Sequence, residues 1–298
     1  MNQIYNLKNG RTLEVISMHG YCFGVKRALN IVVDTMNNKE IERPIYLLGN
    51  LIHNKIVTNE LKNNGIITIE SNNRTRFDML DDIKKGTVIF SAHGISTRVY
   101  QKALDKKLNI VDASCKMVKL IHSKVIQYIK DGYSIIYIGK KNHPECEAIL
   151  EEGNNIYLVT NISDVYNTNI DSDKIYVTNQ TTLSSLETKD IYECIKKKYP
   201  NAILDNKICN ATTERQLALL DQKNKDLIII VGDILSSNTK SLYKIAKDDL
   251  KTEALLIESS EDLKNIDLNK YKNISITSGA SCPEEIFNEV IEYIKEGD

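Results

Sequence analysis

The segment LNIVDASCKMVKLIHSKVIQYI (residues 108–129) changes its pattern of hydrophobic residues at Cys115. The run LNIV before the cysteine is apolar and typical of a strand, whereas Val118, Ile121 and Val125 after it recur at helical spacing. A thiol at such a junction lies beside backbone N–H groups that favour its thiolate form. Packing alone does not require a cysteine at this position.

The arrangement around Cys115 recurs twice more in the chain. Cys22, Cys115 and Cys209 lie at intervals of 93 and 94 residues. Each has a strand-like segment before it, LEVISMHGYC, LNIVDASC or AILDNKIC, and a helical segment after it, FGVKRALNIVV, KMVKLIHSKVIQYI or NATTERQLALLDQ. Equal spacing with matching flanks on both sides indicates an internal threefold repeat.

Strands and helices alternate in the same order in each repeat. After the helix that follows the cysteine come an apolar strand with a polar loop (IYLLGNLIHN, SIIYIGKKNHPE, LIIIVGDILSSN), a second strand (IITIE, IYLVT, ALLIE) and a third strand with a loop (TVIFSAHGIS, KIYVTNQTTLS, NISITSGASC). Such alternation predicts parallel sheets joined by right-handed crossovers. The third repeat ends in a helix, and the strand that it lacks can be supplied by the N-terminal segment LEVISMHGYC.

We therefore predict an α/β protein made of three α/β lobes with parallel sheets, related by a pseudo-threefold repeat. The lobes are expected at residues 23–114, 115–208 and 209–298, and residues 1–22 complete the third. Polar sites on parallel sheets gather at the carboxyl ends of the strands. The strand-end loops of the three lobes can thus face one central cavity.

Composition argues against several classes of protein. The chain has 39 Lys and Arg residues and 40 Asp and Glu residues, which leaves a formal charge of −1 and no broad basic field for nucleic acid or an anionic membrane. No apolar run approaches the ~20 residues of a membrane span. The segment MNQIYNLKNGRTLEV lacks the apolar stretch of a signal peptide. We expect a cytoplasmic protein without nucleic-acid or membrane partners.

The chain has six cysteines and no CxxC pair. This usage argues against a disulfide framework, a zinc finger and a two-cluster ferredoxin. Three thiolates from three repeats leave one coordination position open, which suits either zinc with a water or a [4Fe–4S] cluster whose fourth iron can bind substrate. We interpret Cys146, Cys194 and Cys282, which lie outside the repeat, as structural residues.

The strand-end loops contain further polar residues at equivalent positions of the repeats. Histidine, serine, threonine and asparagine beside helix N-termini suit an anion such as phosphate or diphosphate. His19 and His122 lie outside these loops, and we interpret them as structural. The candidate residues at the second and third strand ends are His53, His143, Glu145, Ser236, Ser237, Asn238, His93, Thr181 and Ser281.

Glu145 is the carboxylate expected at this centre, two residues after His143 in the sequence HPE. Enclosed among thiolates and an anion, it should resist ionisation, which raises its pKa and lets it deliver protons. Pro144 also favours a helix start here, and an acidic residue is common in a first helical turn. A helix-stabilising role therefore stays open beside the catalytic one.

The chain resembles the 4-hydroxy-3-methylbut-2-enyl diphosphate reductase family, also called IspH or LytB. The resemblance extends from about residue 13 to the end and rests on the segments GYCFGVKRA, IHN, SAHGIS, DASC, NHPECE, QTTLS, ICNATTERQ, SSNT and SGAS. It implies a three-lobed α/β fold arranged around one central [4Fe–4S] cluster. Cys22, Cys115 and Cys209 are implied as its three ligands, with one iron left open.

The resemblance also implies a reaction. Two electrons and two protons convert the allylic diphosphate (E)-4-hydroxy-3-methylbut-2-enyl diphosphate to isopentenyl and dimethylallyl diphosphates plus water, the last step of the non-mevalonate pathway. Glu145, with Thr181 at the substrate hydroxyl, is implied in proton relay, and a ferredoxin or flavodoxin is expected as electron donor. The implied diphosphate ligands are His53, His93, His143, Ser236, Ser237, Asn238 and Ser281.

Two positions depart from the family pattern. Lys116 stands where the family usually has proline, and Asp233 and Ile234 stand in a segment that usually resembles GKN. An alternative is therefore a paralogue that senses iron or redox state through the cluster, or that acts on a different diphosphate. A third hypothesis is a zinc hydrolase that acts on a phosphate ester. Metal content distinguishes it from an iron–sulfur reductase.

Overall fold

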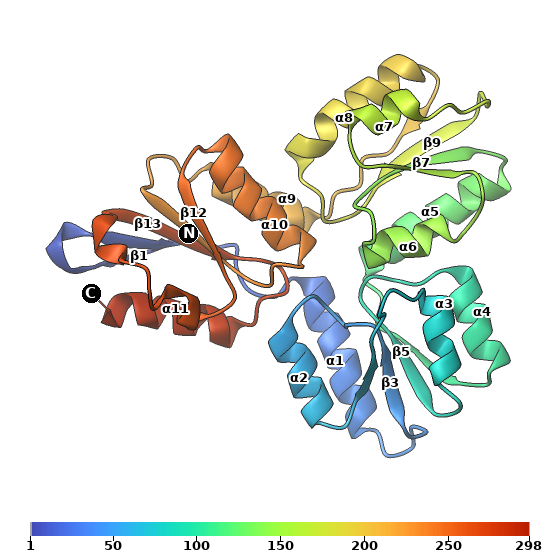
Figure 1. Ribbon diagram of the computed structural model, residues 1–298, viewed down its shortest axis with the longest axis horizontal. Helices are drawn as coiled ribbons and strands as arrows, with labels where there is room; N and C mark the ends of the chain where they lie inside the picture. Colours follow the sequence, from blue (N-terminus) through green and yellow to red (C-terminus); the bar gives the residue numbers. More distant parts are fainter. Residues whose placement is uncertain (1, 298) are drawn as a thin grey trace. The chain divides into compact units, whose positions relative to one another are not determined.

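The computed structural model describes residues 2–297. Within this range the chain forms two compact units, each described by itself below. Figure 1 labels their helices and strands. Among the helices described, none combines the length and the apolar character that a membrane crossing requires. Unit 1 consists of Met1–Phe23, His53–Lys55 and Asn210–Asp298, and unit 2 consists of Gly24–Ile52 and Ile56–Cys209.

Unit 1 is built on a five-stranded sheet. Its strands lie in the order β1, β2, β13, β11, β12, and all neighbours are parallel except β1 and β2, which are antiparallel. The strands are β1 (Gln3–Asn6), β2 (Thr12–Val15), β11 (Leu227–Val231), β12 (Glu253–Ile257) and β13 (Asn273–Ser278). The helices are η1 (Lys8–Gly10), α9 (Asn210–Leu220), α10 (Ser237–Lys244), η3 (Ile245–Asp249), η4 (Ser260–Leu263), η5 (Leu268–Lys270) and α11 (Glu284–Glu296).

Unit 2 contains two four-stranded sheets in which all neighbours are parallel. Their orders are β4, β3, β5, β6 and β8, β7, β9, β10. The strands are β3 (Ile45–Leu48), β4 (Ile67–Ile69), β5 (Thr87–Phe90), β6 (Asn109–Asp112), β7 (Ser134–Ile138), β8 (Ile156–Val159), β9 (Ile175–Asn179) and β10 (Ile203–Leu204). The helices from Phe23 onward are α1 (Phe23–Asn37), α2 (Lys55–Asn63), α3 (Arg76–Met79), η2 (Leu80–Asp82), α4 (Thr97–Asp105), α5 (Lys116–Lys130), α6 (Pro144–Leu150), α7 (Ile162–Asn167) and α8 (Ser185–Lys198).

The three sheets share one strand order. In each, the first strand of the repeat lies between the second and the third, and a fourth strand lies beside the third: β6 beside β5, β10 beside β9 and β2 beside β13. The N-terminal strand β2 pairs in parallel with β13, with Leu13 opposite Ile274. The predicted α/β class with parallel sheets is therefore confirmed. The bounds 23–114, 115–208 and 209–298 of three lobes stay a prediction.

Two strands differ from the sequence-based expectation. β1 was not expected, because its residues QIYN are mostly polar and exposed, and it joins the sheet only at the edge. β10 contains only two residues of the strand expected before Cys209. Asp205, directly after it, still donates its N–H to Val177 O of β9 (2.8 Å), whereas the Lys207 N–H donates to the Asn179 side-chain oxygen (2.9 Å).

The inner strand β11 of unit 1 is buried on both faces, as expected for a parallel sheet covered by helices. Alternate residues of β11 face opposite sides. Ile229 and Val231 pack in a cluster with Phe287 of α11, whereas Ile228 and Ile230 pack with Leu242 of α10. This packing fixes the carboxyl end of β11, from which the loop before α10 departs.

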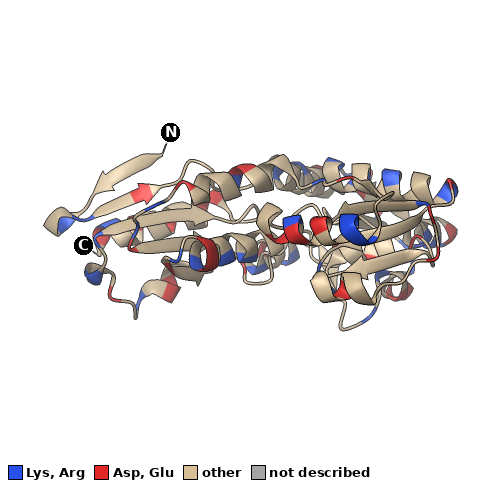
Figure 2. Cartoon of the chain, turned by 90° about the horizontal axis from the view of Figure 1, so that it is seen from above, with Lys and Arg blue, Asp and Glu red and all other residues tan. Residues whose placement is uncertain are grey.

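Acidic and basic residues are distributed over the same elements. In Figure 2, Lys and Arg residues lie interspersed with Asp and Glu residues along the helices and loops. Neither sign of charge dominates these elements, in keeping with the formal charge of −1.

Candidate functional site

Each of the three repeat cysteines directly precedes a helix. Cys22 is followed by α1, Cys115 by α5 and Cys209 by α9. Cys115 is the N-cap residue of α5, with an extended backbone (φ −60°, ψ 140°), and its sulfur does not cap the helix. The three thiols thus have equivalent positions, each directly before a helix.

The backbone of each cysteine is held by the loop that follows the third strand of a repeat. The bonds are Cys22 N–H to Ala280 O (3.1 Å), Cys115 N–H to Ala92 O (3.0 Å) and Cys209 N–H to Thr181 O (2.9 Å). These loops contain the candidate residues Ser281, His93 and Thr181. The repeat inferred from cysteine spacing therefore extends to the hydrogen bonds around each cysteine.

Glu145 is 2% exposed, and its carboxyl group is bonded to two neighbours. Its Oε1 accepts hydrogen bonds from the Thr181 N–H (2.8 Å) and the Tyr137 hydroxyl (3.2 Å), and its Oε2 accepts one from the Thr181 hydroxyl (2.9 Å). Burial raises the pKa of Glu145 to about 7, although these hydrogen bonds lower it. At neutral pH the carboxyl group can therefore both hold and release a proton.

Tyr137 supports this carboxyl group and was missed by sequence reasoning. It is fully buried in β7 (0% exposed). Burial and the nearby charge of Glu145 raise the pKa of Tyr137 well above its usual value, so the phenol stays neutral and donates its proton to Glu145 Oε1. A hydroxyl-bearing residue in the otherwise apolar stretch IIYI was the only signal in the sequence.

His143 and His93 lie together in unit 2. Their rings are perpendicular, with centroids 5.5 Å apart. His143 is the N-cap residue of α6, and its Nδ1 accepts the Glu145 N–H (3.2 Å), so a neutral ring has its proton on Nε2. The Nδ1 of His93 lies 3.4 Å from the Ser91 hydroxyl.

Arg76 connects the loops that contain these two histidines. It is 5% exposed, and its guanidinium donates to Gly94 O (2.7 Å), Pro144 O (3.3 Å) and the Ser91 hydroxyl (3.4 Å). Burial lowers the pKa of Arg76, but arginine keeps its charge at neutral pH. No pattern in the sequence marked this residue, because it lies in α3, outside the strand-end loops.

The candidate residues of unit 1 are also brought together. The Ser281 hydroxyl donates to His53 O (3.1 Å), and the Asn54 amide donates to Ser281 O (3.2 Å). Asn238 Oδ1 accepts the Ala280 N–H (3.0 Å), which ties α10 to the same loop. Ser236 is the N-cap residue of α10, and its hydroxyl accepts a hydrogen bond from the N–H of the third helical residue.

The two departures from the family pattern have different environments. Lys116 is exposed at the first position of α5. Asp233 is 5% exposed, and its Oδ1 accepts the Leu235 N–H (2.6 Å), which closes the loop before Ser236. Ile234 and Leu235 are 54% and 56% exposed, so this loop presents apolar side chains to solvent.

The site residues divide between the two units. Unit 1 holds Cys22, His53, Ser236, Ser237, Asn238 and Ser281, and unit 2 holds Cys115, Cys209, His93, His143, Glu145 and Thr181. Within unit 2, Glu145 bonds Thr181 and His143, and within unit 1, Ser281 bonds His53. A single cavity lined by both groups stays a prediction.

The model of the LytB protein family matches residues 14–295 of the chain. The chain belongs to the LytB family. Among curated LytB relatives, the 4-hydroxy-3-methylbut-2-enyl diphosphate reductase of Bacillus subtilis (strain 168) is 41% identical over 285 residues, which cover 95% of this chain and 90% of the relative. The reductase of the same name from Geobacillus kaustophilus (strain HTA426) is 41% identical over 293 residues, with coverage of 96% and 91%.

Solved structures of LytB-type reductases resemble the chain as well. The E-1-hydroxy-2-methyl-but-2-enyl-4-diphosphate reductase of Plasmodium falciparum matches with a TM-score of 0.86 at 34% identity, covering 94% of this chain and 86% of that one. A structure of (E)-4-hydroxy-3-methyl-but-2-enyl diphosphate reductase, described as the terminal enzyme of the non-mevalonate pathway, matches with a TM-score of 0.66 at 29% identity and coverage of 95% and 98%.

Proposed function

We propose that the chain reduces (E)-4-hydroxy-3-methylbut-2-enyl diphosphate to isopentenyl and dimethylallyl diphosphates, the last step of the non-mevalonate pathway. The observation that supports this most directly is the buried Glu145–Thr181 pair in a chain of the LytB family. Removal of a hydroxyl as water needs a proton donor. A carboxyl group with a pKa of about 7 and a bonded hydroxyl can provide one.

We propose that Cys22, Cys115 and Cys209 hold a [4Fe–4S] cluster with one open iron. The donor set suits such a group, since the three soft thiols begin equivalent helices and none of the six cysteines forms a disulfide in the described residues. When bound, the cluster supplies electrons and a Lewis-acidic iron for the substrate hydroxyl. In this proposal each of the lobes 23–114, 115–208 and 209–298 lies next to one cysteine, and residues 1–22 complete the third.

The remaining residues have binding and proton-transfer roles in this proposal. Thr181 bonds the substrate hydroxyl and passes the proton that Glu145 holds. The two electrons come from a ferredoxin or flavodoxin in the cytoplasm, and the two protons balance the water that leaves and the new C–H bond. The diphosphate is bound by His53, His93, His143, Ser236, Ser237, Asn238 and Ser281.

The test is the iron and acid-labile sulfide content of anaerobically purified protein, measured together with turnover of the hydroxylated diphosphate by a strong reductant. We expect about four iron and four sulfide per chain, a brown colour and both products. Colourless, inactive protein after anaerobic reconstitution contradicts the reductase. One zinc per chain without sulfide would favour a phosphate-ester hydrolase instead.

A second candidate function is iron or redox sensing, or reduction of a different diphosphate. The exposed Lys116 and the Asp233–Ile234 pair favour it, because these positions depart from the family pattern.

Glu145→Gln separates these functions. The reductase loses about 100-fold or more in kcat, since general acid catalysis contributes at least that much, while the exposed Glu193→Gln serves as the matched control. A sensor keeps its response in cells after Glu145→Gln. Turnover of another diphosphate in preference to the expected one would indicate changed specificity.

A further inference from the structure

The helices that follow two of the cysteines hold the segments that lead into other cysteines. Arg27 of α1, the helix after Cys22, donates from Nη1 to Ser114 O (3.0 Å), the carbonyl directly before Cys115. Arg215 of α9, the helix after Cys209, donates from Nη2 to Gly20 O (2.6 Å), two residues before Cys22. It also donates to His19 O (3.3 Å) and Ala211 O (3.1 Å). Each contact lies within one unit.

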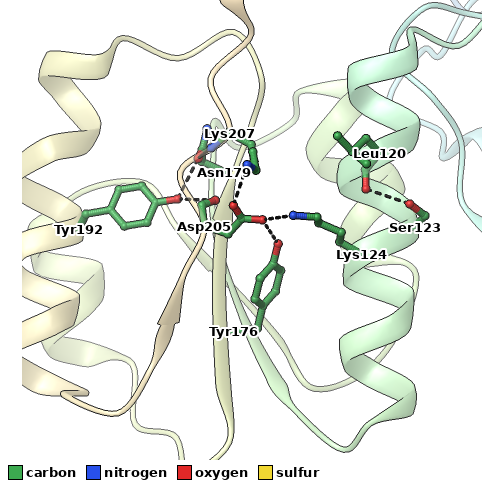
Figure 3. A network of polar contacts seen from close by, with 8 residues as sticks. All are labelled: Leu120, Ser123, Lys124, Tyr176, Asn179, Tyr192, Asp205 and Lys207. Atoms are coloured by element: carbon green, nitrogen blue, oxygen red, sulfur yellow. Dashed lines mark hydrogen bonds and ion pairs between the residues drawn. The ribbon is translucent and has the colours of Figure 1, made fainter.

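The third helix makes the equivalent connection through a carboxylate. Lys124 of α5, the helix after Cys115, donates to Asp205 Oδ2 (2.7 Å) in the segment before Cys209 (Figure 3). The same Oδ2 accepts the Tyr176 hydroxyl (2.7 Å), and Lys207 Nζ lies 3.2 Å from Oδ1. The partners come from α5, β9 and the segment itself.

Beyond β10, the Asp205 N–H of this segment still donates to Val177 O of β9 (2.8 Å), and side chains add further contacts. Asn179 Oδ1 accepts both the Lys207 N–H (2.9 Å) and the Tyr192 hydroxyl (2.8 Å), and the Tyr192 hydroxyl lies 3.3 Å from Asp205 O. Figure 3 shows Tyr192, Tyr176 and Lys124 reaching Asp205 and its neighbours from different elements. The network thereby fixes the chain four residues before Cys209.

We propose that Arg27, Lys124 and Arg215 are positioning residues that set the placement of the three cysteines and the electrostatics of the group they hold. This inference rests on the proposed cluster. Along the chain the contacts form a closed cycle, since the helix after each cysteine anchors the segment before the next. A basic residue therefore lies within the first three turns of every cysteine helix.

The electrostatic consequence follows from the charge of the ligands. Three thiolates and an iron–sulfur core form an anionic group, and fixed positive charge around such a group raises its reduction potential. Groups that orient metal ligands from behind also determine how firmly the metal is held. Arg215 is 3% exposed, so water screens its charge little.

The test compares Arg27→Gln, Lys124→Gln and Arg215→Gln in the full-length holoenzyme. We expect each to release iron to a chelator about 10- to 100-fold faster than the unmodified protein, as is typical when residues that orient metal ligands are replaced. We also expect a lower reduction potential and changed electron paramagnetic resonance g-values of the reduced cluster. Arg27→Lys retains the charge and should restore most of the potential.

Matched controls are Lys26→Gln and Lys130→Gln, which replace exposed lysines on α1 and α5. Lys130 lies at the far end of α5, about 20 Å from Lys116 at 1.5 Å per residue. Both controls should release iron at the unmodified rate. Thermal unfolding of each variant is measured in parallel. If Arg215→Gln does not fold, iron release and reduction potential of the variants at the half-buried Arg27 and Lys124 provide the test.

The outcomes separate this inference from the proposed function. A stable cluster in the unmodified protein with equal iron release and potential in Arg27→Gln, Lys124→Gln and the controls overturns the inference and leaves the reductase intact. Unmodified protein that binds no iron and sulfide overturns both. Faster release and a lower potential confined to the three variants support it.

Discussion

At the scale of single residues, Glu145 shows how burial sets the protonation of a carboxyl group. Removal from water disfavours its charged form more than the hydrogen bonds from Thr181 and Tyr137 favour it, so its pKa rises from 4.5 to about 7. The same bonds fix its orientation. Three hydrogen bonds, two of them from Thr181, thus keep this buried carboxyl group directed at Thr181.

The raised pKa of Glu145 predicts a pH-dependent stability. In the unfolded chain this carboxyl group ionises around pH 4.5 and in the folded chain around pH 7, so between these values the folded state binds more protons and stability falls as pH rises. The difference corresponds to ~3 kcal/mol. The Glu145→Gln variant has no ionisable group at this position. From pH 4.5 to pH 8 it should therefore gain ~3 kcal/mol of unfolding free energy relative to the original chain.

Urea unfolding at pH 4.5, 6 and 8 measures this effect. Glu193→Gln, which replaces an exposed carboxyl group on α8, should follow the original chain at every pH. Parallel curves for Glu145→Gln and the original chain would show that burial does not shift this group.

Residues inside the repeat could be predicted from sequence, whereas their supporting partners could not. Glu145, at the start of α6, and Thr181, just after β9, follow the carboxyl ends of parallel strands, where topology alone brings polar groups together. Tyr137 contacts Glu145 from strand β7, and Arg76 contacts Gly94 and Pro144, next to the two histidines, from the short helix α3. Their roles depend on which side chains meet in three dimensions, and no spacing in the sequence encodes that.

At the scale of elements, the short helix α3 serves as a support for two loops. Arg76 begins it, and its buried guanidinium reaches the loop after β5 and the start of α6. Its own N–H donates to the Glu147 carboxylate (2.9 Å), which fixes the helix against α6. His93 and His143 therefore keep their relative placement through a residue that is distant from both in the sequence.

Replacement of Arg76 by Gln should impair substrate binding more than turnover. Hydrogen bonds from a charged group contribute ~1.5–3 kcal/mol each, so loss of even one loosens the histidine loops enough for a ~10-fold rise in KM. We expect kcat per bound cluster to change by less than about threefold, since the proton donor is intact. Steady-state kinetics, with iron content as the normalising measure, tests this.

Arg74→Gln is the matched control for Arg76. It lies two residues away and is partly exposed, in an ion pair with Asp82, so KM should stay unchanged. A lowered melting temperature of Arg76→Gln with an unchanged KM would restrict Arg76 to a purely structural role.

Hydrophobic periodicity predicts the buried helices and strands, but it does not predict polar edge strands or where a strand ends. β11 was evident from LIIIV, which is buried along its whole length. β1 was not, because an exposed edge strand needs no apolar residues. β10 is shorter than expected, because the Lys207 N–H bonds the Asn179 side chain and the Asp205 carboxylate bonds Lys124, contacts that the sequence pattern does not indicate.

At the scale of the whole molecule, the shared strand order of the three sheets gives the three cysteines equivalent surroundings. Each begins a helix and donates its N–H to the loop after a central strand. Equivalent surroundings imply equivalent consequences when the thiol is lost.

Cys22→Ser, Cys115→Ser and Cys209→Ser should therefore lose iron and sulfide to a similar degree. A hydroxyl is a poor ligand for a soft iron–sulfur site, so we expect less than about a quarter of the original iron content in each variant after anaerobic reconstitution. Cys194→Ser is the control, since this half-buried residue lies on α8 outside the repeat, and it should retain the full content. Loss confined to one of the three would contradict their equivalence.

The pairing of β2 with β13 has a consequence for the synthesis of the chain on the ribosome. Arg11, just before β2, bonds Tyr271 O across a separation of 260 residues. At ~5–20 residues per second, about 13–50 s pass between the emergence of the two strands. The sheets of unit 2 can form meanwhile, but β2 must wait with an unpaired edge until nearly the last helix has been made. Substitutions that make this short strand more apolar should thus affect yield in the cell before they affect the finished protein.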